Sequence, residues 1–180
     1  VLTWLKNNPN YNLAAIVSMS DSGWSTGVLR DEFWILPPGD IRRAVLALSR
    51  ESKMVRELFE YRFDKKSSVS WHTVWNLLLT AMSDITWSFE SGLQEVCSMF
   101  RVDGKVIPVT LEKSDLWVIL EDGTQVIWET NIDCPLHDGN LCIKEAFLTP
   151  EVPLNPNAKN IFENSDIIII GPGDLYTSII

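Results

Sequence analysis

Two short apolar runs, each followed at once by a loop of small polar residues, restrict this chain most strongly to an α/β fold. Residues 13–19 (LAAIVSM) precede residues 20–27 (SDSGWSTG), and residues 166–171 (DIIIIG) lead into residues 171–178 (GPGDLYTS). Continuous apolar runs of this length are typical of strands that are buried on both faces of a parallel sheet. Open α/β sheets bind ligands at the carboxyl ends of their strands. The pattern therefore predicts a parallel sheet with a ligand site at that edge.

Outside these two runs, the spacing of apolar residues is typical of helices up to about residue 100 and of strands from about residue 105. Helices are expected at about 1–8, 40–48, 53–63, 72–85 and 88–100, with a short one near 158–163. Strands are expected over 105–110, 116–120, 125–130 and 143–148, with EDGT at 121–124 as a hairpin turn. The residues expected on the apolar helix faces are Ile41, Val45, Leu48, Val55, Leu58, Phe59, Leu77, Leu78, Ala81, Ile85, Phe89, Leu93, Val96 and Phe100. This order predicts one α/β domain over residues 1–180, with an antiparallel β insertion at about 105–148.

The composition excludes several classes of function. The 180 residues carry a formal net charge of −9 with a pI near 4.7, which argues against a nucleic-acid partner. The longest strongly apolar run, residues 167–170, is too short to span a membrane, and no secretory signal is visible. Three cysteines without a framework spacing favour a reducing compartment. We therefore expect a cytoplasmic protein.

The segment CPLHDGNLC, residues 134–142, places His137 between Cys134 and Cys142. A metal site could use these three side chains, but a fourth ligand and the usual close cysteine pair are both missing. A surface loop with incidental cysteines is the favoured interpretation.

The loop after residues 166–170 contains the parts of a phosphate cradle. Gly171 and Gly173 would let the backbone approach a ligand closely, and Thr177 and Ser178 offer hydroxyl groups near a helix start. A plain turn between a strand and a helix would use the same residue types. The presence of two such loops makes the binding site and the plain turn about equally favoured.

Four further polar side chains are candidates for ligand contacts. Asp21 and Asp40 could bind Mg²⁺ or accept a hydrogen bond from a sugar hydroxyl, although a helix N-cap is the favoured role for Asp40. His72 and Asn76, four residues apart, would share one face of a helix. For these two, a structural hydrogen-bonded pair is an equally good interpretation.

Three segments together resemble one known family. ILPPGDIRR at 35–43, NLLLTAM at 76–82 and IIIIGPGDLYTSII at 167–180 resemble the gluconeogenesis-factor (YvcK) branch of the CofD-like family. The loop DSGWSTG at 21–27 resembles that branch's DDGGSSG. The resemblance runs over residues 1–180. Family members are longer, so an opening strand with a GGGTG loop and the part after residue 180 are expected to be missing from this chain.

The resemblance implies a Rossmann-like, doubly wound and mainly parallel α/β fold with a nucleotide-type ligand. In the YvcK branch the ligand is a nucleotide sugar such as a UDP-sugar, and the proteins support cell shape and envelope synthesis. The CofD branch instead transfers a phospholactyl group to a deazaflavin with Mg²⁺, in the biosynthesis of coenzyme F420. The PPGDIR segment at 37–42 favours the first branch. A degenerate paralogue that binds nothing is a third alternative.

The expected partner is accordingly a nucleotide sugar or a related phosphorylated small molecule, and a homo-oligomeric state stays open. No catalytic residue is assigned and no cofactor is expected, with Mg²⁺ reserved for the transferase alternative. Ser22 replaces the second Asp of the first loop and Arg43 stands where Asn is usual, which weakens a metal-dependent mechanism. The ligand-binding residues implied by the family motifs are Asp21, Ser25, Thr26, Gly27, Asp40, His72, Asn76, Gly171, Pro172, Gly173, Tyr176, Thr177 and Ser178.

Most of the eight tryptophans stand where the family pattern has glycine. These are Trp4, Trp24, Trp71, Trp75, Trp87 and Trp128, and Trp34 falls at a position that is often glycine. Glycine is used where φ is positive or where another chain comes close, and tryptophan suits neither situation. We hypothesise that these are UGA codons, which some bacterial lineages read as glycine, translated with a code that reads them as tryptophan. The alternative is a real protein whose cleft has filled with aromatic side chains.

Overall fold

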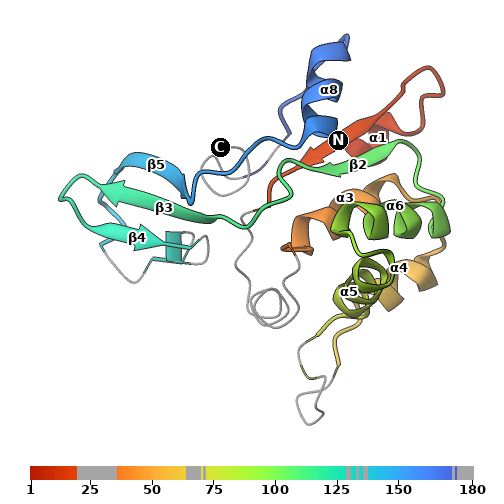
Figure 1. Cartoon of the computed structure of the whole chain (residues 1–180), viewed down its shortest axis with the longest axis horizontal. Helices are drawn as coiled ribbons and strands as arrows, with labels where there is room; N and C mark the ends of the chain where they lie inside the picture. Colours follow the sequence, from red (N-terminus) through yellow and green to blue (C-terminus); the bar gives the residue numbers. More distant parts are fainter. Residues whose placement is uncertain are drawn as a thin grey trace.

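The structure, a computed structural model, describes residues 1–19, 36–63, 70, 72–128, 131–132, 134–135, 138–171 and 173. These residues form a mixed α/β fold with a parallel sheet and a small antiparallel sheet (Figure 1). The helices are α1 (Leu2–Leu5), α3 (Gly39–Leu48), α4 (Lys53–Glu60), α5 (Val74–Thr86), α6 (Phe89–Met99) and α8 (Pro156–Asn164). The strands are β1 (Ala14–Val17), β2 (Lys105–Pro108), β3 (Asp115–Leu120), β4 (Gln125–Ile127) and β5 (Ile143–Thr149). No helix of this described part is long and apolar enough to cross a membrane.

The parallel sheet joins two strands that lie far apart in the sequence. β1 pairs with β2 in the register Ala14↔Lys105 to Val17↔Pro108. Gly104 precedes β2 with φ of +107°, and a Cβ on it would lie only 2.4 Å from the Leu13 carbonyl oxygen. Glycine is therefore required there for two reasons, a positive φ and the close approach of the two chains. Helices α3 to α6 lie on one side of these strands and α8 lies on the other (Figure 1).

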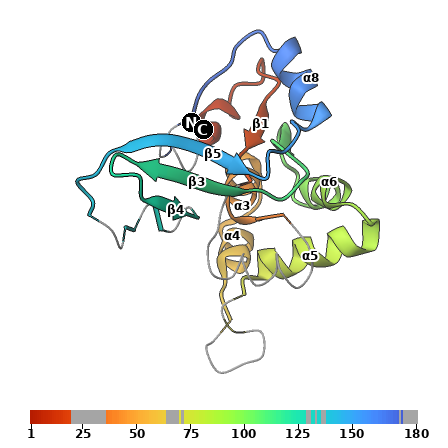
Figure 2. The same ribbon diagram turned by 60° about the vertical axis from the view of Figure 1, so that its left-hand side comes forward.

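The second sheet is antiparallel, with the strand order β4–β3–β5 (Figure 2). Burial alternates along β3, where Leu116, Val118 and Leu120 are buried. This period of two is that of a sheet with one covered face. The predicted EDGT turn is confirmed, since Gly123 has φ of +86° and its amide donates to the Leu120 carbonyl oxygen at 3.0 Å.

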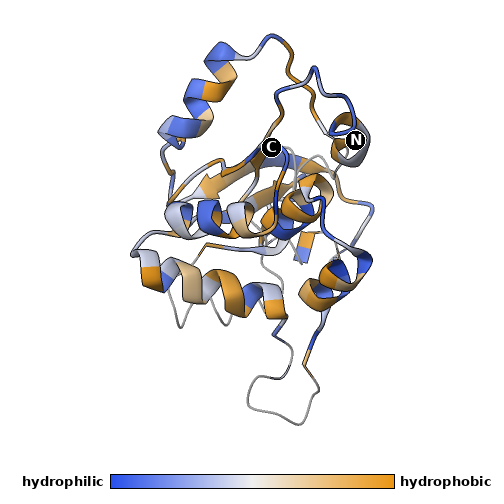
Figure 3. Ribbon diagram, turned by 90° about the vertical axis from the view of Figure 1, so that its right-hand side faces the viewer, coloured by the Kyte–Doolittle hydropathy of each residue, from blue (hydrophilic) through white to orange (hydrophobic). Residues whose placement is uncertain are grey.

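The main core lies between the parallel strands and the helices α3 to α6. Ile41, Val45 and Leu48 of α3 are completely buried, as their helical spacing predicted. Leu93 and Val96 of α6 are buried with them, and Phe89 and Phe100 pack against the same cluster. Figure 3 shows that α8, in contrast, is largely hydrophilic. The predicted faces of α3 and α6 are therefore confirmed.

The predicted apolar face of α5 is wrong. Ala81 and Ile85 are exposed and Leu77 and Leu78 are only half-buried, while the buried residues are Trp75, Asn76, Leu79, Thr80 and Ser83. The reason is that α5 packs closely against α6, and small side chains allow the shorter distance between the two helices.

In α4, Phe59 is buried as expected, but Leu58 is 53% exposed because its side of the short helix faces solvent.

The prediction of a parallel strand at 166–171 is also wrong. Residues 166–171 belong to no strand, and Ile167 to Ile170 are between 55% and 76% exposed. A strand exists only where a neighbouring strand takes up its backbone hydrogen bonds. Among the described residues, β1 pairs with β2 alone, and no strand pairs with residues 166–171.

Asn155 ties α8 to the parallel sheet. Its buried side-chain amide donates to the Pro108 carbonyl oxygen and to a Glu90 carboxylate oxygen, both at 3.0 Å. Its Oδ1 accepts from the Asn157 amide at 2.9 Å, which caps α8, and its own backbone amide donates to Val109 at 2.8 Å. One side chain therefore joins β2, α6 and α8.

We expect Asn155→Ala to lower the free energy of unfolding by about 2–3 kcal/mol, because the substitution leaves buried hydrogen-bonding groups unpaired and removes an N-cap. Urea unfolding followed by circular dichroism measures the change. Asn160→Ala, on the exposed part of α8, is the control and should stay within about 0.5 kcal/mol. Equal losses in the two variants would show that the Asn155 contacts do not anchor the helix.

Candidate functional site

Only part of the predicted site lies within the described residues. Asp40, His72, Asn76, Gly171 and Gly173 are described. The predictions for the other members lie outside the described residues; these are Asp21, Ser25, Thr26, Gly27, Pro172, Tyr176, Thr177 and Ser178. Asp40 and Asn76 place the described part of the candidate site at the starts of α3 and α5.

A hydrogen bond joins the N-termini of α3 and α5. The Trp75 indole Nε1–H donates to the Pro38 carbonyl oxygen at 3.0 Å. Pro38 is the N-cap of α3, and Trp75 lies in the first turn of α5. The Trp75 ring is fully buried and meets the Phe59 ring edge-on, with 5.6 Å between centroids. Two helix N-termini, each with the positive end of its dipole, are thus held near one another.

Asp40 lies in the first turn of α3, so its prediction as the N-cap is wrong. The helix begins one residue earlier, at Gly39, because Pro38 can precede a helix without needing an amide donor. The Asp40 carboxylate accepts from Arg43 Nη1 at 3.1 Å, one turn along the helix. A carboxylate at this position interacts favourably with the helix dipole and offers an acceptor for hydroxyl groups.

Thr73, which sequence reasoning did not single out, begins α5. Its Oγ1 accepts from the Asn76 amide at 3.1 Å, which is the ordinary N-cap contact. His72 therefore lies before the helix, and its carbonyl accepts from the Phe63 amide at 3.1 Å. The prediction that His72 and Asn76 share one face of a helix is wrong for this reason. A threonine directly before an apolar run was the sequence signal for the cap.

Asn76 is buried, with 3% of its surface exposed. Its carbonyl accepts from Thr80 Oγ1 at 2.7 Å inside α5. Gly171 and Gly173 are exposed, and a Cβ on Gly171 would meet nothing within 4 Å. Open space beside Gly171 leaves room for a ligand, and the predicted close approach of a ligand to its backbone stays a prediction.

The described residues offer no cluster of three or more His, Cys, Asp or Glu side chains that could hold a metal ion. Asp40 is already engaged by Arg43. Burial raises the pKa of the Cys97 thiol to about 12, and the neighbouring Glu121 carboxylate raises the pKa of Cys142. Neither thiol has the lowered pKa of a nucleophile.

Four of the seven tryptophans at glycine positions are described, and they divide into two pairs. Trp87 and Trp128 have φ of +57° and +74° and are 91% and 47% exposed. Trp4 lies in the helix α1 and Trp75 in the helix α5, where φ is negative. The Trp75 side chain is fully buried and packs in the main core. The backbone thus requires the freedom of glycine at two of these four positions.

Comparisons with known proteins agree with the resemblance. Residues 1–180 match the family model described as 2-phospho-L-lactate transferase CofD. The chain is 41% identical over 182 residues to the gluconeogenesis factor of Bacillus subtilis and 40% identical over 181 residues to that of Listeria innocua. Both alignments cover 100% of this chain, and they cover 56% and 55% of the two relatives. The chain therefore spans about half the length of these curated relatives.

A solved structure shows the same fold. The crystal structure of protein BH3568 from Bacillus halodurans superposes with a TM-score of 0.90 and 38% sequence identity, over 99% of this chain and 56% of that one. Sequence identity at this level over almost the whole chain shows a family relationship in addition to the shared fold. This chain belongs to the CofD family.

Proposed function

We propose that the protein to which this chain belongs binds a nucleotide sugar, such as a UDP-sugar, and acts as a regulator of the gluconeogenesis-factor type. In this proposal the α/β unit is a single domain over residues 1–180 with a Rossmann-like, doubly wound sheet. The protein is cytoplasmic and supports cell shape and envelope synthesis. The relatives at about 40% identity, which are gluconeogenesis factors, favour this role.

The observation that carries the proposal is the junction of α3 and α5. The hydrogen bond between Trp75 and Pro38 holds two helix N-termini together. Backbone N–H groups and helix dipoles at such ends attract anions such as a diphosphate. Asp40, which lies beside them in the first turn of α3, supplies an acceptor for a sugar hydroxyl. The loops 20–27 and 171–178 are proposed to complete the site.

The second candidate function is a transferase like 2-phospho-L-lactate transferase, whose name the matching family model carries. Such an enzyme would need Mg²⁺ ligands, and the described residues supply no such cluster. Because Ser22 replaces an acidic residue of the first loop, the regulatory role is the better supported of the two.

Calorimetry with UDP-N-acetylglucosamine tests the proposal on the full-length protein with glycine at six of the seven tryptophan positions. Trp75 is kept, because its indole joins α3 and α5. We expect saturable binding that persists in EDTA. Asp40→Asn should weaken the affinity about tenfold, because one hydrogen bond to a charged acceptor is lost. Asp84→Asn, in the last turn of α5, is the matched control and should bind like the unmodified protein.

Two results would reject this proposal. Turnover of a guanylylated phospholactate donor that requires Mg²⁺, with no heat from UDP-N-acetylglucosamine, would establish the transferase. Absence of both activities in the glycine-restored protein would establish a chain that has lost its ligand.

A further inference from the structure

A pocket of about 370 Å³ lies at the end of α3 opposite the candidate site. Its lining residues are Lys6, Asn7, Pro9, Ser49, Arg50, Arg56 and Asp103. α3 has ten residues, so the pocket and the Asp40 end of the helix are about 15 Å apart along its axis. The volume falls within the range of small-molecule sites.

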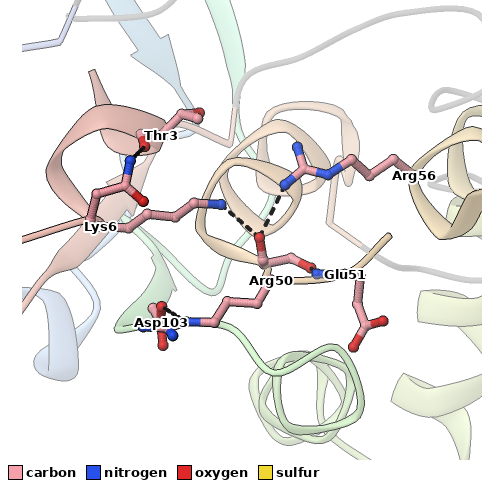
Figure 4. Close-up of polar contacts among 8 residues, drawn as sticks. Thr3, Lys6, Arg50, Glu51, Arg56 and Asp103 are labelled. Atoms are coloured by element: carbon pink, nitrogen blue, oxygen red, sulfur yellow. Dashed lines mark hydrogen bonds and ion pairs between the residues drawn. The ribbon is translucent and has the colours of Figure 1, made fainter. Parts of the chain in front are cut away.

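Two cations from different elements converge on one backbone oxygen in this pocket (Figure 4). Lys6 Nζ donates to the Ser49 carbonyl oxygen at 2.7 Å, and Arg56 Nη2 donates to the same oxygen at 3.1 Å. Ser49 is the C-cap of α3 and is 1% exposed. A single cation is enough to satisfy the negative end of a helix dipole. The second cation brings more positive charge than the helix end requires.

The charges that line the pocket do not balance. Arg50 adds a third cation, and Asp103, its ion-pair partner through Nε, is the only acidic residue among the lining side chains. Glu51, the nearest acid in sequence, pairs instead with Arg101 at 3.9 Å. Within the described residues, no carboxylate forms an ion pair with Lys6 or Arg56. The lining therefore carries an excess of two positive charges in a chain whose net charge is −9.

The electrostatics of Lys6 agree with this excess. Burial lowers the pKa of Lys6, and the neighbouring cations Arg56 and Arg50 lower it further, while Asp103 acts in the opposite direction. An anion placed among the three cations would relieve their mutual repulsion and would accept charge-assisted hydrogen bonds.

We propose that the pocket formed by Lys6, Arg50 and Arg56 binds a small oxyanion, either inorganic phosphate or the phosphoryl group of a small metabolite. The exposed Arg50 guanidinium supplies the planar donor pair that suits a phosphoryl group. Lys6 and Arg56, which are held by the Ser49 carbonyl, supply charge from a fixed position. The site is separate from the proposed nucleotide-sugar site and does not depend on it.

Calorimetry with inorganic phosphate at constant ionic strength tests the proposal on the full-length protein. We expect saturable binding with a Kd of about 1 mM or tighter. Arg50→Gln should weaken it about tenfold, because one charge-assisted contact is lost, and Asp103→Asn should strengthen it several-fold, because a competing carboxylate is removed. Lys144→Gln removes an exposed positive charge on β5, outside the lining, and should leave the Kd unchanged. Glycerol 3-phosphate in a parallel titration distinguishes the two ligand sources, since a metabolite site binds it more tightly than phosphate.

Equal phosphate affinity in the Arg50→Gln and Lys144→Gln variants would show general ionic attraction and overturn the proposal. No saturable heat in the unmodified protein would show that the cations only stabilise the end of α3. UDP-N-acetylglucosamine binding should be the same in the Arg50→Gln variant and the unmodified protein. The two proposals therefore fail separately.

Discussion

Gly92→Ala is expected to destabilise the fold by about 3 kcal/mol, because the added methyl group has no space. Gly92 lies in α6, where a Cβ would be 2.7 Å from the Ser83 amide nitrogen and 2.8 Å from the Met82 carbonyl carbon. Both of these atoms belong to the backbone of α5, so no side-chain rotation relieves the contact. The two helices would have to move apart, and closely packed interiors resist such a movement.

Chemical denaturation of the two proteins gives the difference in unfolding free energy. Gly139→Ala is the matched control, because its Cβ would lie 3.8 Å from its nearest neighbour, Pro135, at an ordinary contact distance. The control should change stability by no more than about 0.5 kcal/mol. A Gly92→Ala variant as stable as the control would mean that α5 and α6 do not pack at this distance. The same displacement would move the N-terminus of α5, so nucleotide-sugar binding should weaken as well.

The double variant Trp87→Gly/Trp128→Gly is expected to be more stable than the chain as written, by about 2 kcal/mol. Both residues have a left-handed backbone, which costs a side-chain-bearing residue about 1–2 kcal/mol and costs glycine little. Little packing is lost at Trp87, which is 91% exposed. For a chain of this size, the gain corresponds to a rise in Tm of about 4–8 °C.

The hydrogen bonds around Trp87 show why its backbone has this conformation. The Ser88 amide donates to the Ser83 carbonyl at 3.1 Å, and the Trp87 amide donates to Asp84 at 3.3 Å. Together they form the Schellman ending of a helix, where glycine is the usual residue. Both hydrogen bonds of this helix ending are present, although tryptophan is strained in the left-handed backbone conformation that they require.

Trp4→Gly is the control for this prediction, because Trp4 is also exposed but lies in a helix. Glycine there should lower stability by up to about 1 kcal/mol. A double variant that loses stability as the control does would show that tryptophan is well accommodated at both sites. The gene provides an independent test of the decoding hypothesis, since TGG codons at Trp87 and Trp128 would refute it.

The sequence predicted local structure well, because local structure depends on residues that are close in the chain. The spacing of Ile41, Val45 and Leu48 located α3 and its buried face, and the EDGT turn located the β3–β4 hairpin. The family motifs led to the CofD family, which the comparison over the whole chain confirmed. The predicted ligand-binding role of Asp40 and Asn76 stays a prediction.

The sequence failed where the answer depended on how one helix or strand packs against another. The apolar pattern of α5 pointed to Ala81 and Ile85, but Gly92 of α6 allows a backbone approach that buries Ser83 and Thr80 instead. The four isoleucines at 167–170 had the composition of a strand, but composition does not provide a neighbour for the backbone hydrogen bonds.

The sequence alone thus determined the helices, the turns and the family, because periodicity and motifs are properties of short stretches. Only the tertiary structure decided which face of α5 is buried, that β1 pairs with β2, and that Lys6, Arg50 and Arg56 share one pocket. Those outcomes depend on contacts between different helices and strands, such as Gly92 with Ser83 and Ala14 with Lys105, and such contacts are set by packing.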